Sequence, residues 1–177
     1  MRRNSNLEIY RPNPKNIPPP FRATSADRTN SGIPFSYEID GRVSAKEIAT
    51  LCLSATGASF KAEDWEDELA ETYRHVTVRV RGPEGMLVGF VRANMDNDDP
   101  EKCIVDDAMI RSQYKGRGIF SKMVKLGLEQ LREDGFSEVL FKNDAGTEKM
   151  YAHLGFLATG DGFSLDLQNR MNTDVSV

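Results

Sequence analysis

The segment Gln113-Tyr114-Lys115-Gly116-Arg117-Gly118-Ile119 is the most informative stretch of this sequence. It follows a stretch, 104–110, that predicts a strand, and it precedes a run with helical spacing, 119–134. Two glycines one residue apart let the backbone approach a ligand closely. The first N–H groups of the following helix have no partner within that helix, so they attract anions. The segment therefore predicts an anion cradle, residues 113–120, that suits a pyrophosphate.

Two common nucleotide-binding motifs fit this cradle poorly. A P-loop needs Gly-Lys-Ser/Thr where this chain has Gly118-Ile119-Phe120. A Rossmann loop needs a third Gly or Ala where Ser121 stands, and it follows the first strand of its fold. Here the cradle follows the fourth predicted strand, so both nucleotide-binding hypotheses are weak.

The rest of the chain predicts alternating strands and helices. Strands are expected over 33–39, 76–81, 86–93, 104–110 and 139–141, with one or two more over 156–167. Helices are expected over 44–57, 63–73, 119–134 and 148–154. Ser44 and Glu47 predict a capping box at the start of the first helix, and Gly57 predicts its end. This order indicates a mixed α/β sandwich with helices on a central sheet.

The buried faces of the helices can be assigned from spacing. The second helix is expected to bury Trp65, Leu69 and Tyr73, and the third Phe120, Val124, Leu128 and Leu131.

Charge divides the chain of 177 residues, whose net charge is −4, into two unequal parts. Residues 1–31 carry six basic and two acidic side chains and five of the eight prolines, which predicts a disordered basic extension. The remainder, 32–177, carries a net charge of −8 and is expected to form one domain. We expect a cytoplasmic protein, with an organelle transit peptide as the alternative role of the extension.

Composition excludes several classes of protein. No apolar run approaches the roughly 20 residues of a membrane span, and a mildly acidic chain is not expected to bind nucleic acid. Cys52, Cys103, His75 and His153 lie in unrelated contexts, so no metal site is expected. Cys103 has no His nearby in sequence, which favours packing over an acyl-cysteine intermediate.

Two motifs give the sequence a family resemblance. Gln113, Gly116 and Gly118 fit the pattern Gln/Arg-x-x-Gly-x-Gly/Ala and resemble the acetyl-coenzyme A (acetyl-CoA) motif of the GNAT superfamily of N-acetyltransferases. Tyr151, followed four and five residues later by Gly155-Phe156, resembles the second signature of that family. Leu87-Val88-Gly89-Phe90 is similar to the strand that precedes the motif in the family.

The resemblance implies an α/β (α+β) fold with a mostly antiparallel sheet of about six to seven strands and about four helices. It implies direct transfer of an acetyl group from acetyl-CoA to a primary amine. Residues 87–96, 106–107 and 141–156 resemble most the small-amine branch, which includes compact bacterial and serotonin-type enzymes and acts on arylalkylamines or amino sugars. Two alternative functions remain: a protein or peptide acetyltransferase, and a non-catalytic coenzyme-binding module. A homodimer is possible with any of the three functions.

The resemblance also implies roles for individual residues. Tyr151 is the expected general acid for the leaving thiolate, because a phenol stays protonated at neutral pH. The expected coenzyme-binding residues are Ala108, Met109 and Ile110, through their backbone, and Gln113, Lys115, Gly116, Arg117, Gly118, Ile119, Phe120, Asp144 and Tyr151. Asp144 and Thr147 stand where many members have Asn and Ala.

The base and the acceptor contacts are less constrained by the sequence. Side chains alternate along a strand, so Asp106 and Asp107 are expected on opposite faces. We assign Asp106 as the base and Asp107 to a structural or substrate contact. Trp65, with Phe60, either lines an acceptor pocket or packs in the core.

Overall fold

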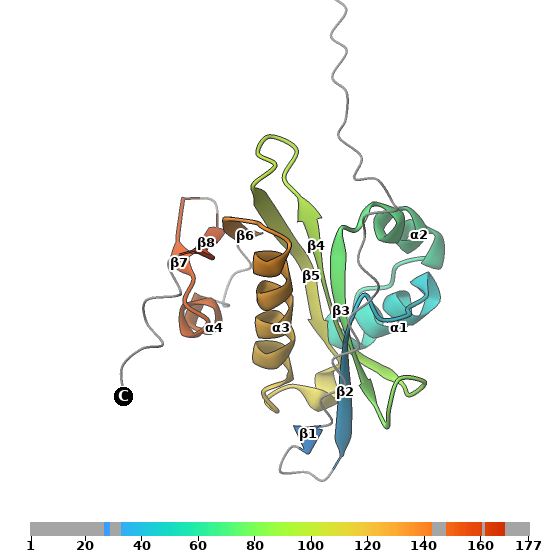
Figure 1. Cartoon of the computed structure of the whole chain (residues 1–177). Helices are drawn as coiled ribbons and strands as arrows, with labels where there is room; N and C mark the ends of the chain where they lie inside the picture. The colour runs from blue at the N-terminus through green and yellow to red at the C-terminus, as the bar shows by residue number, and fades with distance from the viewer. Residues whose placement is uncertain (1–26, 29–32, 143–147, 161, 169–177) are drawn as a thin grey trace, which may run out of the picture.

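The computed structural model describes residues 27–28, 33–142, 148–160 and 162–168. They form one sheet in the order β1-β2-β3-β4-β5-β6-β8-β7, with helices on both faces (Figure 1). The strands are β1 (Asp27–Arg28), β2 (Pro34–Ile39), β3 (Arg74–Val80), β4 (Leu87–Met95), β5 (Lys102–Ile110), β6 (Glu138–Lys142), β7 (Leu157–Ala158) and β8 (Gly162–Asp166). The helices are α1 (Ala45–Thr56), α2 (Ala62–Glu71), α3 (Ile119–Glu133) and α4 (Glu148–His153), with a 3₁₀ helix at Ser112–Tyr114.

Neighbouring strands are antiparallel except for β5 and β6. That pair is parallel because α3 carries the chain from the end of β5 back to the start of β6. The predicted fold, a mostly antiparallel sheet with about four helices, is confirmed. The described part has one strand more than expected, β1, which pairs with the start of β2 and falls within the stretch 1–31.

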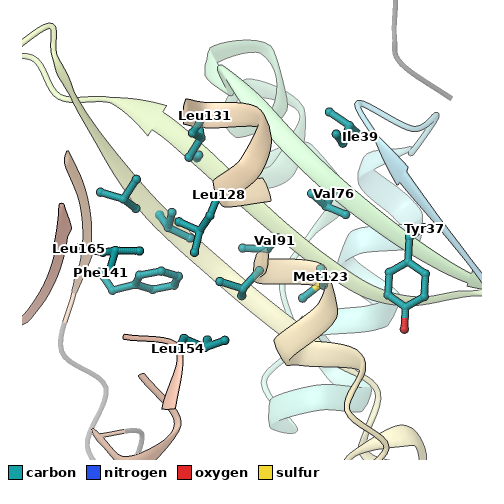
Figure 2. Close-up of a cluster of buried hydrophobic side chains, with 14 of the residues drawn as sticks. Tyr37, Ile39, Val76, Val91, Met123, Leu128, Leu131, Phe141, Leu154 and Leu165 are labelled. Atoms are coloured by element: carbon teal, nitrogen blue, oxygen red, sulfur yellow. The ribbon is translucent and has the colours of Figure 1, made fainter. Parts of the chain in front are cut away.

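The apolar face of α3 covers one face of the sheet, as Figure 2 shows for Met123, Leu128 and Leu131. These side chains are at most 3 % exposed and belong to the same buried cluster as Val76 and Val91. Burial of each contributes roughly 1.5–3 kcal/mol. The predicted stripe is confirmed except at Phe120, which is half-buried because it lies in the first turn beside the cradle. The packing of α3 fixes the position of its N-terminus at the end of β5.

α1 and α2 lie on the opposite face, where α1 packs against β4 and β5 and α2 against α1. The predicted capping box is confirmed, since the amide of Glu47 donates to the Ser44 hydroxyl at 3.3 Å and the Ser44 amide donates back to the Glu47 carboxylate at 3.0 Å. Gly57 ends α1 in the left-handed conformation, as expected. Trp65 is buried from α2, whereas the predicted Tyr73 lies beyond the helix end.

Candidate active site

The predicted anion cradle lies between β5 and α3. Gly116 and Gly118 have φ values of +76° and +74°, which residues with a side chain rarely adopt. Gly118 is the N-cap of α3, and no side chain caps the helix there. The N–H groups of the first turn are therefore left for an anion.

The space in front of the two glycines supports the same interpretation. A Cβ at either position would meet no atom within 4 Å. Backbone N–H groups at the positive end of a 15-residue helix are a suitable donor set for a diphosphate. These residues therefore fit the diphosphate of the coenzyme that the sequence motif implies.

The start of the cradle and the residue before it are hydrogen-bonded to α1. The Lys115 ammonium donates to the Ala55 carbonyl at 3.1 Å, and the Ser112 hydroxyl donates to the Ser54 carbonyl. Both acceptors lie in the last turn of α1, where carbonyls lack helical partners. Lys115 is thus bound to α1 in this structure, whereas Arg117 stays beside the cradle over the Tyr114 ring. Gln113 is exposed on the 3₁₀ helix.

The edge of β5 that faces β6 is only partly paired. Among the described residues the pairing runs from Lys102↔Glu138 to Val105↔Phe141. The predicted coenzyme-binding residues Ala108, Met109 and Ile110 lie beyond the last pair. Their backbone groups on this edge have no β6 partner in the described chain, so they can bind the amides of a pantetheine arm.

Tyr151 of α4 lies between this edge and the cradle. Its ring centroid is 4.6 Å from that of Phe141, the last β6 residue paired with β5, and 6.3 Å from that of Phe120 in the first turn of α3. Phe163 lies at 4.8 Å, and the Tyr151 side chain is 3 % exposed. The fold therefore brings the second sequence motif against the first, and the aromatic contacts hold the Tyr151 ring in place.

A β-bulge interrupts β5 just beyond its last pair with β6. Asp107 and Ala108 together oppose the single residue Val91 of β4. Asp107 has a φ of +50°, an uncommon value for a residue with a side chain. A bulge leaves its extra residue without a ladder partner, so this stretch of backbone has groups available on the coenzyme side of the sheet.

The bulge overturns one expectation. Strict alternation placed Asp106 and Asp107 on opposite faces, and that prediction is wrong because the alternation ends at the bulge. Asp106 accepts from Asn94 Nδ2 at 3.4 Å, and Asp107 accepts from Arg92 Nε at 2.6 Å. Arg92 and Asn94 share one face of β4, the face that α2 covers. Both carboxylates therefore lie on the α2 side, with Asp107 the more exposed.

Arg92 connects the bulge to α2. Besides Asp107, its guanidinium contacts the Glu68 carboxylate at 2.5 Å and the Glu68 carbonyl at 3.2 Å. It lies 6.0 Å from the centre of the Trp65 ring and is 7 % exposed. Burial alone would lower the pKa of Arg92, but its contacts with Asp107 and Glu68 raise it above the ordinary value. The charged form is therefore secure.

Two buried polar atoms near this cluster have no hydrogen-bond partner within the described chain. They are Nε1 of Trp65, a donor, and Oδ1 of Asn94, an acceptor. Buried polar groups are nearly always paired. These two atoms are therefore exceptions on the α2 side of the sheet.

The other candidates have plain outcomes. Cys103 is buried in the α3 cluster, and burial raises its pKa to about 12, so the thiol is neutral and a poor nucleophile. Asp144 lies outside the described residues.

In the described ranges, no group of three or more His, Cys, Asp or Glu side chains is arranged to hold a metal ion. None of the helices there is long and apolar enough to cross a membrane.

Sequence reasoning missed Arg92, Glu68 and Asn94. Arg92 could have been found, because it interrupts the otherwise apolar run 87–93 and a buried charge needs a partner. Its partner Glu68 could not have been found from the sequence, because Glu68 lies 24 residues away from Arg92 on a helix with several acids.

These features define an α/β domain with an anion cradle at a helix N-terminus and an open strand edge beside it. The model of the acetyltransferase (GNAT) family matches residues 14–156, and the chain belongs to this family. The protein is therefore an acyltransferase, and acetyl-CoA is its acetyl donor. The resemblance drawn from the two motifs is confirmed at the level of the family.

Several solved structures share the fold. A GNAT family N-acetyltransferase from Escherichia coli, solved in complex with CoA, is 18% identical over 83% of this chain and 89% of that chain, with a TM-score of 0.64. The ribosomal-protein-S18-alanine N-acetyltransferase of Escherichia coli is 12% identical over 74% and 94%, with a TM-score of 0.60. A GNAT family acetyltransferase from Brucella melitensis, in complex with acetyl-CoA, is 18% identical over 73% and 87%, with a TM-score of 0.57. No curated protein matches the sequence.

Proposed function

We propose that this enzyme moves the acetyl group of acetyl-CoA directly to the primary amine of a small molecule, an arylalkylamine or an amino sugar. The observation that carries the proposal is the position of Tyr151 between the anion cradle and the open edge of β5. The proposed site for the diphosphate is then the cradle, and the proposed site for the pantetheine arm is the edge of β5. Tyr151, next to the leaving thiol, lies between them.

The backbone amides of residues 116–120 would hold the diphosphate, with Gln113 and Arg117 beside them. The backbone of residues 108–110 would hold the pantetheine amides, and Asp144 stands where the family places a further coenzyme contact. The coenzyme supplies an acetyl thioester, whose carbonyl oxygen becomes negative when an amine attacks. A backbone N–H at the β5 bulge is the proposed donor to that oxyanion.

Tyr151 is the proposed general acid. A phenol has an ordinary pKa near 10, so it carries its proton at neutral pH and can give it to a departing thiolate. The packing of Phe120, Phe141 and Phe163 around the ring supports this role because it limits the Tyr151 hydroxyl to one direction.

Asp106 is the proposed base. A primary amine arrives mostly as ammonium, since its pKa is near 10, and it must lose a proton before it attacks. Asp107 lies on the same face, but its carboxylate is already in contact with the Arg92 guanidinium at 2.6 Å, so it is less available to an incoming amine. Asp106 instead accepts a hydrogen bond from the amide of Asn94 at 3.4 Å.

The character of the α2 side supports a small aromatic or polar amine. Trp65 packs edge to face with Phe60 at 6.4 Å, and the Phe60 side chain is 49 % exposed, so an aromatic surface is open to a ligand. The competing acceptor is the amine of a protein or peptide, and one solved neighbour is by its name a ribosomal-protein-S18-alanine N-acetyltransferase. Such an acceptor needs an open groove where a small amine needs a pocket.

We further propose that the part of residues 1–31 that precedes β1 forms a disordered basic extension to the domain. We also propose that the enzyme acts in the cytoplasm as a homodimer. The charge difference between the two parts supports the division. Light scattering of the full chain and of a chain that starts at residue 27 tests both the assembly and the boundary.

A panel of acceptors tests the substrate class. Thiol release from acetyl-CoA is measured with tryptamine, glucosamine and a peptide with an N-terminal alanine, each at several concentrations. The proposal predicts the highest kcat/KM for one of the two small amines. A higher value for the peptide would assign the enzyme to protein acetylation instead.

A further inference from the structure

We propose that Arg92 is a positioning residue for acetyl transfer. By holding the Asp107 side chain against α2, it fixes the backbone of the β5 bulge in the orientation that directs an N–H to the developing oxyanion. The inference rests on the proposed function, because the bulge has this role only if an acetyl thioester lies beside it.

The bulge needs an anchor. Asp107 stands at a φ of +50°, where a residue with a side chain stays only when its surroundings hold it. The peptide between Asp107 and Ala108 is opposed by one residue of β4 and lies beyond the pairing with β6. The ladder therefore restrains it less than the rest of β5, and the 2.6 Å contact with Arg92 supplies a restraint from the side chain.

Arg92 is itself held at several points. Its planar guanidinium reaches Asp107, the Glu68 carboxylate and the Glu68 carbonyl, and it lies beside the Trp65 ring. Such a fork of donors fixes the relative positions of its acceptors in a way that one ammonium group cannot. The bulge is thereby tied to α2, the helix that lines the proposed acceptor side.

The chain offers a matched control in Arg79. It is 6 % exposed, lies in β3, and binds the Glu47 carboxylate at 2.6 Å and the carbonyls of Arg42 and Gly85 at 2.7 and 2.8 Å. Arg79 therefore matches Arg92 in burial and in having three polar contacts of its guanidinium. It joins β3 to α1, and none of these three contacts within the described residues reaches β5. Loss of either fork costs a similar amount of packing and hydrogen bonding.

The test compares Arg92→Lys with Arg79→Lys. Hydroxylamine serves as the acceptor, because it is neutral at neutral pH and small enough to need no specific pocket. For each variant, kcat and KM for acetyl-CoA are measured by thiol release, the Kd for CoA by calorimetry, and Tm by scanning calorimetry. Asp107→Asn, which tolerates the left-handed conformation but weakens the ionic contact, is the second variant at the bulge.

We expect Arg92→Lys to lower kcat by about tenfold or more, as partial loss of an oxyanion donor does, with the Kd for CoA changed less than about twofold. Asp107→Asn lowers kcat in the same direction. Arg79→Lys lowers Tm by about as much as Arg92→Lys does, but its kcat stays within about twofold of the wild-type value.

Two results would overturn the inference: an unchanged kcat in Arg92→Lys, or equal losses of kcat in Arg92→Lys and Arg79→Lys. Failure of the proposed function would show differently, in the wild-type protein, as absence of CoA binding or of thiol release.

Discussion

Gly118 carries two requirements of the cradle in one residue. Its φ of +74° sets the turn into α3, and the open space in front of its α-carbon is where the diphosphate is proposed to lie. A side chain at this position would be strained by the backbone and would also fill that space.

Replacing Gly118 by leucine should therefore weaken CoA binding at least about a hundredfold, or about 2.7 kcal/mol. Calorimetric titration with CoA measures the change. The control is Gly135→Leu at the other end of the same helix, where φ is +98° and a Cβ would also meet no atom within 4 Å. Both variants should lose about 1–2 kcal/mol of stability from the strain. Equal CoA affinity in the two variants would refute the cradle.

At the scale of single elements, α3 contains a weak point. Gly127 lies in the middle of the helix, beside a small cavity of about 20 Å³ between α3 and the sheet. A Cβ at this position would contact Val76 at 3.5 Å, an ordinary van der Waals distance.

Gly127→Ala should raise the free energy of unfolding by about 0.5–1 kcal/mol, because alanine loses less backbone entropy in a helix and the added methyl group has room. Urea denaturation measures the change. As a control, Gly135→Ala should lower the free energy of unfolding. A loss of stability in Gly127→Ala would mean that the space beneath α3 is smaller than described.

The start of α1 should respond to acid. The pKa of Glu47 lies below its ordinary value of 4.5, first because Arg79 donates to its carboxylate and then because Ser44 does. A carboxyl whose pKa is lowered by folding stabilises the protein above its ordinary pKa, and this stabilisation is lost as the pH falls through the lowered value.

Glu47→Gln should therefore lower Tm at neutral pH, and the difference from wild type should narrow below pH 4.5. Glu66→Gln, an exposed acid on α2, is the control and should show no such convergence. A difference that stays constant with pH would argue against the ionised capping contact.

The elements differ in how well the sequence predicts them. The stripe of α3 and the capping box of α1 follow from local periodicity and spacing, which need no knowledge of the tertiary structure. The β5 bulge does not, because it depends on how Asp107 and Ala108 fit opposite Val91, a residue on another strand. The placement of the two aspartates failed for this reason, and the Arg92 contact with Glu68 was beyond reach because its partner is distant in sequence. The cradle was predictable since its donors are backbone groups of consecutive residues.

On the scale of the whole molecule, the net charge of −8 on residues 32–177 should affect the choice of acceptor. An acidic surface attracts cationic amines, and salt screens this attraction over about 8 Å at physiological ionic strength. The kcat/KM for tryptamine should therefore fall a few-fold as sodium chloride is raised, whereas that for neutral hydroxylamine should not. Equal salt dependence for both acceptors would show that the negative charge of the domain does not favour cationic amines.

The central claim is that Tyr151, between the cradle and the open edge of β5, assists transfer of acetyl from acetyl-CoA to an amine. The most direct test measures thiol release together with acetylated amine by mass spectrometry, in wild type, Tyr151→Phe and the control Tyr73→Phe, whose ring packs on Phe136. We predict equal amounts of thiol and acetylated amine in wild type. We also predict a kcat lowered by about a hundredfold in Tyr151→Phe with CoA binding retained, and little change in Tyr73→Phe. An unchanged kcat in Tyr151→Phe, or thiol release without acetylated amine, would contradict the account.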